Sequence, residues 1–305
     1  MHLVNLILPI FIVIFLGFFL KKAGFFDELF VQVLNRLVYQ VLLPVLVFWE
    51  IARSSFQTSF NPRPVAVAYT AMGVLWLAIW AAGKIFRLRP AAVGSFNQGA
   101  FRGNLAYIGL AVASNVYGTT GLSKAGVLAG FMIPFMNFFS ILALPGAGGR
   151  HQTRHRIPVA SIFFNPLILA SFGGLLFSFF SLSIPALIAG TLRLVSSLSL
   201  PLALISLGGS LSFAGIRNER LLAALAVLLK LLLLPFLGLI LLRACGVSGL
   251  DYRITVLLLA CPTAVVTYIM AVELEGDPKL AASIVMWSTL LSLANLPVWI
   301  WIVGF

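Results

Sequence analysis

Long apolar runs dominate the chain, and polar residues collect in the short segments between them. Each run has about 20 residues, the length that an α-helix needs to cross the hydrocarbon core of a bilayer. Polar and apolar residues do not alternate within the runs, which favours helices over strands. We predict ten transmembrane helices, over 3–20, 30–50, 64–86, 95–117, 122–144, 158–180, 185–213, 220–243, 253–274 and 280–303.

The composition supports an all-α integral membrane protein. The 305 residues are 61% hydrophobic and only 9% charged, too little charge for the surface of a soluble domain. The net charge of +12 does not indicate nucleic acid as a partner, because the basic residues are spread over the ends of the apolar runs. We therefore expect the lipid bilayer to be the main surrounding of the chain.

The basic residues also predict an orientation. Segments after odd-numbered runs hold eleven Lys and Arg, and segments after even-numbered runs hold five. Because basic residues are retained in the cytoplasm, we expect a multi-pass protein of the cytoplasmic (inner) membrane with both termini outside. The eleven are Lys21, Lys22, Lys84, Arg87, Arg89, Arg150, Arg154, Arg156, Arg217, Arg220 and Lys279.

The second half of the chain repeats the first about 157 residues later. RLVYQVLLP at 36–44 aligns with RLVSSLSLP at 193–201, and Gly17 aligns with Gly174. A repeat of five helices must enter the membrane in the opposite sense the second time. We therefore predict two inverted five-helix repeats, 1–145 and 158–305, joined by a cytoplasmic linker over 146–157.

The fourth and ninth helices are predicted to be broken. Pro262 removes an amide donor from the ninth helix, and Gly103-Asn104 occupies the aligned position in the fourth. A kink at Pro262 in a continuous ninth helix is the alternative. Two half-helix starts that face each other would expose free amides and suit an anion.

Polar residues around these breaks are the candidate binding groups for a small organic anion. Asn104 offers donors and an acceptor, Thr263 and Thr267 offer hydroxyls, and Gly103 and Pro262 supply the break itself.

Three further polar residues lie within apolar runs. Arg102 either attracts a carboxylate or extends to the membrane interface, and we leave both open. Asn137 either points into the polar site between the two breaks or forms a hydrogen bond to a neighbouring helix, and the second alternative is favoured. Lys230 lies near the middle of the eighth helix and is a candidate charge partner.

Enzyme chemistry has little support in the sequence. The histidines are at a terminus or in the linker, with no metal-ligand spacing, and no phosphate-binding loop is present. We therefore expect no enzymatic activity, no cofactor and no metal.

Four stretches resemble one known family in its own order. They include FRGNLAYIGLAV at 101–112, NPLILASFGGLL at 165–176 and ACPTAVVTYIMAVELEGDPKLAASIV at 260–285. The chain resembles the bacterial branch of the auxin efflux carrier family. This resemblance implies crossed helices four and nine, as in bile acid symporters and sodium–proton antiporters. It also implies a scaffold of helices 1, 2, 6 and 7, a moving core of helices 3–5 and 8–10, and a homodimer through the scaffold.

The resemblance further implies substrates such as auxin, malate or malonate, with the substrate in contact with Asn104. One departure is that relatives commonly carry proline shortly after this asparagine, where this chain has Gly109-Leu110-Ala111. We expect a less sharply interrupted fourth helix here.

These observations together predict a secondary transporter that exports small organic anions by an elevator-type alternating-access mechanism. Carboxylates are nearly missing from the apolar runs, which favours uniport. The alternatives are a sodium- or proton-coupled symporter and, in another class, a membrane sensor or scaffold that transports nothing.

Overall fold

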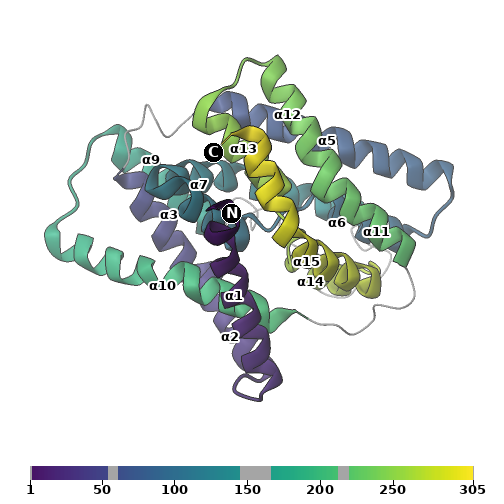
Figure 1. Cartoon of the computed structure of the whole chain (residues 1–305), viewed down its shortest axis with the longest axis horizontal. Helices are drawn as coiled ribbons and strands as arrows, with labels where there is room; N and C mark the ends of the chain where they lie inside the picture. The colour runs from purple at the N-terminus through teal and green to yellow at the C-terminus, as the bar shows by residue number, and fades with distance from the viewer. Residues whose placement is uncertain (1, 54–60, 145–165, 212–219, 305) are drawn as a thin grey trace. The chain divides into compact units, whose positions relative to one another are not determined.

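The protein was studied as a computed structural model that describes residues 2–53, 61–144, 166–211 and 220–304 (Figure 1). Over these ranges the chain is helical, with one isolated β-bridge and no strand. The predicted all-helical class is confirmed, and six helical runs are long and apolar enough to cross a membrane. The inverted arrangement of ten helices stays a prediction, and the linker over 146–157 lies outside the described residues.

The helices follow the predicted runs closely. They are α1 (His2–Lys22), α2 (Glu28–Leu37), α3 (Leu43–Ala52), α5 (Pro62–Ile85), α6 (Pro90–Phe101), α7 (Leu110–Ala143), α9 (Pro166–Phe179), α10 (Ala186–Ser210), α11 (Arg220–Leu228), α12 (Leu234–Ala244), α13 (Gly249–Ala260), α14 (Val266–Glu273) and α15 (Pro278–Val303), with the π-helical turns η1 (Val38–Leu42), η2 (Leu105–Gly109) and η4 (Leu229–Leu233).

Two of the π-helical turns have a direct cause in the sequence. η1 and η4 each end two residues before a proline, Pro44 and Pro235. Proline has no N–H for the carbonyl four residues earlier, so the preceding turn widens. The Leu43 amide accordingly bonds the Val38 carbonyl, and the Leu234 amide bonds the Leu229 carbonyl.

The predicted boundary between the fourth and fifth runs falls at Gly118. This glycine is non-helical within α7, with φ of 65°, a backbone conformation that glycine adopts without strain. At an offset of 158 residues, the sequence repeat aligns Gly118 with Gly276. Gly276 lies in the turn between α14 and α15, where its amide donates to the Ala271 carbonyl at 2.8 Å. Both aligned glycines therefore mark chain turns.

The described residues pack into two compact units. Unit 1 comprises Met1–Pro62, Leu105–Phe131 and Phe164–Leu211, and unit 2 comprises Arg63–Asn104, Met132–Phe163 and Ser212–Phe305. Unit 1 contains the helices of the expected scaffold, and it also contains residues 105–131, which the resemblance assigns to the core. The division into scaffold and core stays a prediction.

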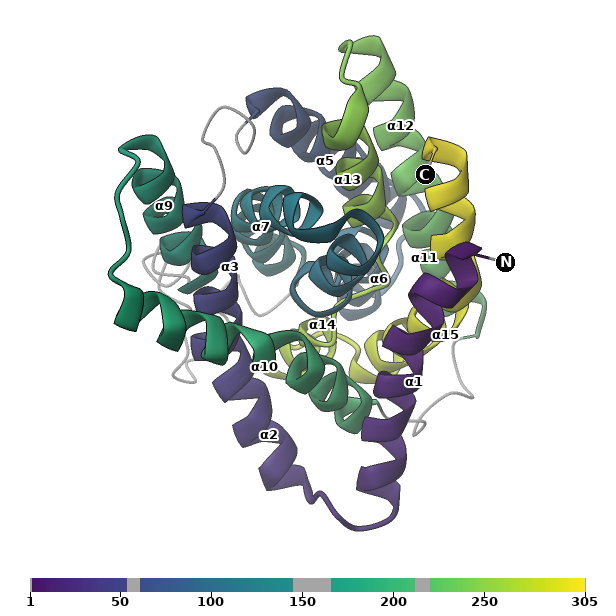
Figure 2. The same cartoon turned by 60° about the vertical axis from the view of Figure 1, so that its left-hand side comes forward.

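Within unit 1, α1 packs along α10 and α3 packs along α9 (Figures 1 and 2). The sequence repeat relates α1 to α9 and α10 to α2–α3, so the two pairs are equivalent and each contains one helix from each half of the chain. The hydroxyl of Ser199 donates to the carbonyl of Leu42 at 2.7 Å, which joins two positions that are aligned in the repeat.

Polar contacts attach residues 105–131 to the rest of unit 1. The Tyr107 hydroxyl donates to Asn35 Oδ1 at 3.2 Å, and the Ser123 hydroxyl donates to the Glu50 carbonyl at 2.9 Å. Hydrogen bonds between helices hold a membrane protein together where the hydrophobic effect between helices is weak.

Buried aromatic residues connect the helices of unit 2. The indole N–H of Trp76 on α5 donates to the Phe139 carbonyl on α7 at 2.9 Å, and the Trp76 carbonyl accepts from Asn97 Nδ2 on α6 at 3.1 Å. Trp299 on α15 donates to the Leu231 carbonyl in η4 at 2.8 Å. A buried indole N–H usually finds such an acceptor, and these bonds set the helix positions around the site described below.

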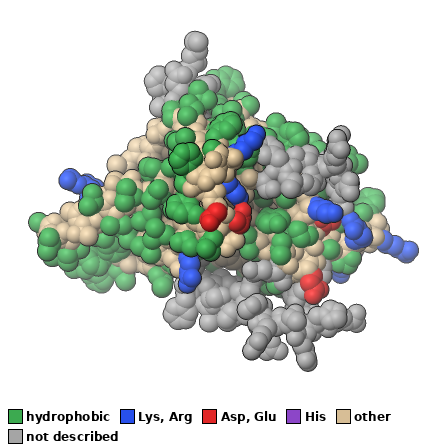
Figure 3. Space-filling view, turned by 90° about the horizontal axis from the view of Figure 1, so that it is seen from below, with side chains coloured by type: hydrophobic (Ala, Val, Ile, Leu, Met, Phe, Trp, Pro, Cys, Tyr) green, Lys and Arg blue, Asp and Glu red, His purple; other side chains and the backbone are tan. Residues whose placement is uncertain are grey.

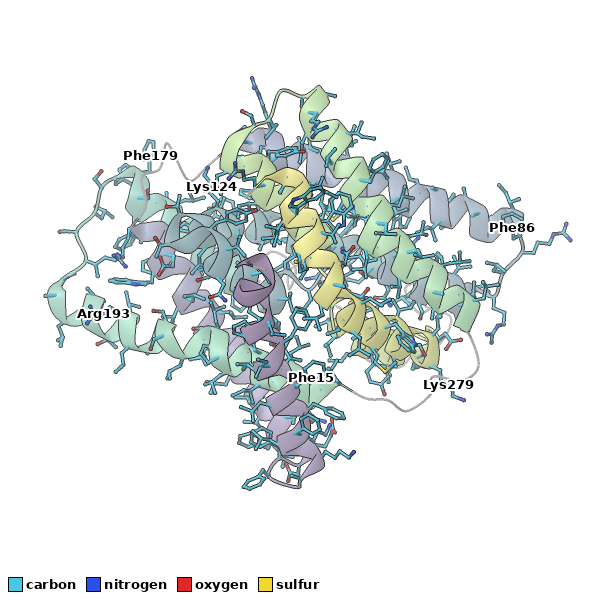
Figure 4. All side chains as sticks on the ribbon, in the orientation of Figure 1. Phe15, Phe86, Lys124, Phe179, Arg193 and Lys279 are labelled. Carbon is cyan, nitrogen blue, oxygen red and sulfur yellow. The ribbon has the colours of Figure 1, made fainter. Side chains whose placement is uncertain are left out.

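The exposed surface is apolar, as a lipid surrounding requires. Large hydrophobic side chains are exposed on many helices, and green apolar side chains cover much of the face in Figure 3, with few basic ones among them. Phe86 and Phe179, labelled in Figure 4, are exposed at helix ends. Lys84 Nζ lies 3.6 Å from the centroid of the Trp80 ring, a pairing of basic and aromatic side chains typical of the membrane interface.

Glycine makes the close contact between α1 and α10 possible, which gives a stability test. A Cβ atom on Gly208 would overlap the Ile14 carbonyl, whereas a Cβ on Gly190 of the same helix would meet open space. We expect Gly208→Ala to destabilise the protein by about 1–3 kcal/mol, because the two backbones must move apart. Gly190→Ala should be neutral or slightly stabilising. Melting temperatures in detergent that fall equally for both variants would contradict this account of the contact.

Candidate functional site

Two interrupted helices meet in unit 2. α6 ends at Phe101 and α13 ends at Ala260, and the extended residues that follow pair in antiparallel fashion through Gly103 and Thr263. The Asn104 amide donates to the Pro262 carbonyl at 2.7 Å, and the Ala264 amide donates to the Arg102 carbonyl at 3.1 Å. We call residues 102–104 and 262–264 the crossing.

The crossing decides between the two predictions for these helices. Both interruptions are confirmed, and a simple kink at Pro262 in a continuous helix is excluded. The fourth helix is interrupted although no proline follows Asn104, which corrects the expectation of a less sharp break. Residues 102–104 pair with residues 262–264, and this pairing supplies the backbone hydrogen bonds that residues 102–104 would otherwise make in a helix.

Side chains from elsewhere in unit 2 replace the hydrogen bonds that each break removes. The Gly99 carbonyl would bond the Gly103 amide in a continuous helix, and here it accepts from Thr263 Oγ1 at 2.7 Å. The Thr263 amide in turn donates to Ser288 Oγ on α15 at 3.0 Å. Because Thr263 and Ser288 are fully buried, water cannot supply these bonds, and the replacements remove the main cost of opening the helices.

Lys230 replaces a lost backbone hydrogen bond at the end of α13. Its side chain is fully buried, and Nζ donates to the Leu259 carbonyl at 2.6 Å. In a continuous helix that carbonyl would accept from the amide of Thr263. No carboxylate of the described residues lies within ion-pair distance of this ammonium group. The predicted mid-membrane charge therefore lies at the negative end of the α13 dipole, beside the crossing.

Arg102 points inward to the end of α7. Only 6% of its surface is exposed, and its guanidinium donates to Asn137 Oδ1 at 2.6 Å and to Ser140 Oγ at 3.1 Å. The alternative in which Arg102 extends to the membrane interface was wrong, because these acceptors on α7 hold the charge inside unit 2. Asn137 bonds a neighbouring segment, as favoured from the sequence, and that neighbour is Arg102.

Asn104 is the polar side chain of the crossing with the most unused bonding capacity. It is 4% exposed, and its side-chain amide makes no hydrogen bond to a described residue. Side chains alternate along an extended segment, so Asn104 and Arg102 project to the same side of the crossing. An acceptor that reached this side would find an amide donor near a fixed positive charge.

The two predicted threonines differ in what they can offer. The Thr263 hydroxyl donates its hydrogen bond to the Gly99 carbonyl, so toward any other group this hydroxyl can act only as an acceptor. Thr267, in the first turn of α14, is fully buried, and its hydroxyl has no hydrogen-bond partner among the described residues. All eight predicted residues belong to unit 2; they are Arg102, Gly103, Asn104, Asn137, Lys230, Pro262, Thr263 and Thr267.

Comparison with known proteins identifies the family. The model of a family described as "Membrane transport protein" matches residues 2–148 and 153–300. The chain belongs to this family. The resemblance to auxin efflux carriers is thereby confirmed, and the chain is a multi-pass membrane transport protein.

The relatives of this membrane transport protein match it over almost their whole length. An uncharacterized transporter of Methanothermobacter thermautotrophicus is 30% identical over 303 residues, 96% of each chain. An uncharacterized transporter of Methanocaldococcus jannaschii is 26% identical, with 98% of each chain covered. A protein of Rhizobium meliloti named "Putative malonate transporter" is 24% identical over 96% of this chain and 93% of its own.

Sequence reasoning missed several polar residues of this membrane transport protein. Ser288 and Ser140 bond the crossing from α15 and α7, and Gln98 is fully buried on α6. Gln98 carried a signal, since an amide in an apolar run one helical turn before Arg102 shares its face. The serines carried none, because serine occurs throughout the helices. Over the described ranges, no cluster of three His, Cys, Asp or Glu side chains is placed to hold a metal ion.

Proposed function

We propose that this membrane transport protein is a secondary carrier of small organic anions and that the crossing in unit 2 binds the anion. The observation that carries the proposal is a buried asparagine, Asn104, whose side-chain amide has no hydrogen bond to a described residue. Two buried cations belong to the same region, Arg102 in the crossing itself and Lys230 at the end of α13. Buried charges are costly in a membrane protein and are retained mainly where they act on a substrate or ion.

A carboxylate is the chemical group that fits this surrounding best. Amide donors and fixed positive charges favour an anion, and the sequence places no Asp or Glu between Glu50 and Glu219 that would repel one from α6 or α7. The relative named "Putative malonate transporter" supports the same class of substrate. Within this site, Asn104 would donate to the carboxylate, Arg102 and Lys230 would attract it, and Thr263 and Pro262 would hold the crossing open.

We further propose alternating access of an elevator type, in which the core helices move against the scaffold helices that the family resemblance implies. In an inner membrane with both termini outside, the membrane potential favours export of an anion by about 2.3 kcal/mol per charge per 100 mV. Export then needs no coupled ion. A homodimer through the scaffold remains part of this proposal and rests on the resemblance alone.

The test is transport by purified protein in liposomes loaded with radiolabelled malonate. We expect Asn104→Ala to lower the initial rate at least tenfold, because the loss of a hydrogen bond to a charged group is worth about 1.5–3 kcal/mol. Asn295→Ala, on α15 outside the crossing, is the matched control and should transport normally.

Three outcomes would count against this proposal in different ways. Equal rates for wild type and Asn104→Ala would remove the crossing from the mechanism. A strict requirement for a sodium or proton gradient would replace uniport with symport. The lack of flux for any small carboxylate by the folded wild type would favour a sensor or scaffold.

A further inference from the structure

The helical segment 28–42, which is α2 together with η1, carries three kinds of side chain on three separate sides. One side is apolar and buried. A second side is apolar and exposed, as contact with lipid requires. The buried side consists of Val31, Leu34, Val38 and Leu42, and the exposed apolar side consists of Leu29, Phe30, Val33, Leu37 and Val41.

The third side is polar and lies between the other two. At 100° per residue, its side chains fall within about 140° of the helix circumference. They are Glu28, Gln32, Asn35, Arg36, Tyr39 and Gln40. Gln32, Arg36 and Gln40 are exposed, so one long side of a predicted membrane span presents a cation and two amides.

Lipid does not suit this polar side. An arginine alone can extend to the membrane surface, but the shorter amide side chains of Gln32 and Gln40 cannot, and an amide in hydrocarbon loses its hydrogen bonds. Besides η1, α2 packs mainly against α10 within unit 1 (Figure 2). Polar side chains that remain exposed in a membrane span usually face water.

The polar side carries a positive charge that the described residues do not neutralise. Glu28 at its start pairs with Lys21, whose Nζ lies 2.6 Å from Oε2. Arg36 Nε donates to Gln40 Oε1 at 3.2 Å, and no carboxylate of the described residues lies within ion-pair distance of this guanidinium. An exposed cation of this kind attracts small anions.

Other elements of unit 1 continue the polar side at the edge marked by Asn35. Asn35 Nδ2 donates to the Ser210 hydroxyl at 2.8 Å, and Asn35 Oδ1 accepts from the Tyr107 hydroxyl at 3.2 Å. Tyr107 belongs to η2, which begins at the residue after Asn104. Hydrogen bonds therefore join the polar side to the segment by which the chain leaves the crossing.

The sequence repeat shows that helix packing alone does not require this polar side. The repeat aligns α2 with the first half of α10. At the positions of Gln32 and Asn35, α10 carries Ala189 and Leu192, whereas the arginine is kept as Arg193. The amides are therefore a property of α2 and not of the packing that the two halves share.

We propose that the polar side of α2 lines a water-filled path for small anions, with Arg36 as the group that attracts them. The inference rests on the proposed function and adds to it a surface along which the anion moves. Gln32 and Gln40 lie one turn before and one turn after Arg36, so their amides offer hydrogen bonds along the path.

The first test is the reaction of single cysteines with charged methanethiosulfonate reagents, which react with thiols in water. Both native cysteines are replaced by alanine, and the full-length protein in liposomes meets the reagent on both faces of the bilayer. Gln32→Cys and Gln40→Cys should react about tenfold or more faster than Val33→Cys and Leu37→Cys, the matched controls on the lipid side of the same helix.

The second test measures the charge of Arg36. At Gln32→Cys, the rate with an anionic sulfonate reagent is divided by the rate with a cationic trimethylammonium reagent. A unit charge about 6 Å away changes each rate about threefold in water, in opposite directions, so adding Arg36→Gln should lower this ratio about tenfold at low salt. Arg36→Lys should preserve the ratio, and added salt should reduce the effect.

Arg193→Gln is the matched control for charge. It removes the aligned arginine, which lies roughly 25 Å further along α10 than Ser210, the serine that bonds Asn35. At that distance salt screens the charge, so the ratio at Gln32→Cys should not change.

The outcomes separate this inference from the proposed function. Equal reaction on the polar and lipid sides would overturn the path. So would unreactive cysteines at both polar positions, which would mean that another protein segment covers them. A ratio that Arg36→Gln leaves unchanged would show that Arg36 does not attract anions. None of these readouts uses malonate, so each can fail while transport through Asn104 stands, and each can succeed while that proposal fails.

Discussion

Replacing Lys230 with methionine is expected to weaken anion binding about 30-fold without unfolding the protein. The ammonium group lies 2.6 Å from the Leu259 carbonyl, and the crossing begins about one helical turn beyond it, roughly 8 Å from the charge. At that separation a unit charge attracts an anion by about 2 kcal/mol for an effective dielectric constant near 20. Stability should change little, because burying a lone ammonium is itself costly and offsets the lost hydrogen bond.

Two companion variants separate the charge of Lys230 from its hydrogen bond. Lys230→Gln removes the charge but keeps a donor for the Leu259 carbonyl, so it should bind malonate as weakly as Lys230→Met. Lys230→Arg keeps the charge and should bind at least tenfold more tightly than either. Binding by the methionine and glutamine variants within twofold of wild type would show that Lys230 acts only as a helix cap.

Replacing Arg102 with methionine is expected to lower the free energy of unfolding by about 3–5 kcal/mol as well as to abolish anion binding. The guanidinium bonds Asn137, Ser140 and the Met136 carbonyl, all at the end of α7. Without it, these buried acceptors lose their donor, and removal of one partner from a buried polar set is strongly destabilising. Unfolding in detergent followed by circular dichroism measures the loss.

A double-mutant cycle with Asn137→Leu isolates the shortest of these bonds. Arg102 and Asn137 should show a coupling free energy of about 1.5–3 kcal/mol, the range for hydrogen bonds to charged groups. As a control, a cycle that combines Arg102→Met with Ser123→Ala, at a buried serine of unit 1, should show no coupling free energy. Additive effects of Arg102→Met and Asn137→Leu would mean that the observed 2.6 Å contact contributes nothing to stability.

The crossing illustrates how a helix is opened where water is absent. Three backbone groups released by the breaks are bonded again: the Leu259 carbonyl to Lys230, the Thr263 amide to Ser288 and the Gly99 carbonyl to Thr263. An interrupted helix in a membrane is otherwise prohibited by the cost of unpaired backbone groups. Lys230 thus bonds a released carbonyl and also places a positive charge beside the crossing, which links the stability of the crossing to its proposed function.

Much of this site could be predicted from local sequence. Pro262 forbids a regular helix by itself, and its alignment with Asn104 indicated a second break. The break at Asn104 was harder to predict, because no proline follows it. It depends on pairing with residues about 160 positions away, and the energy of that pairing leaves no trace in the local pattern.

The inward direction of Arg102 could not be predicted for a similar reason. A long basic side chain in an apolar run either extends to the interface or finds buried acceptors, and both are compatible with the same sequence. The acceptors are 35 and 38 residues away on α7, so their position follows from helix packing.

By itself, the sequence determined that the chain is a helical membrane protein, where its apolar runs lie, where two of them break and which family it belongs to. These properties depend on hydrophobic length, on proline and glycine, and on residue order, all of which act over a few residues. Only the tertiary structure decided that Lys230 caps α13 and that Arg102 binds α7. Those facts depend on which helices pack side by side, and a hydrogen bond of about 3 Å is decided by that packing.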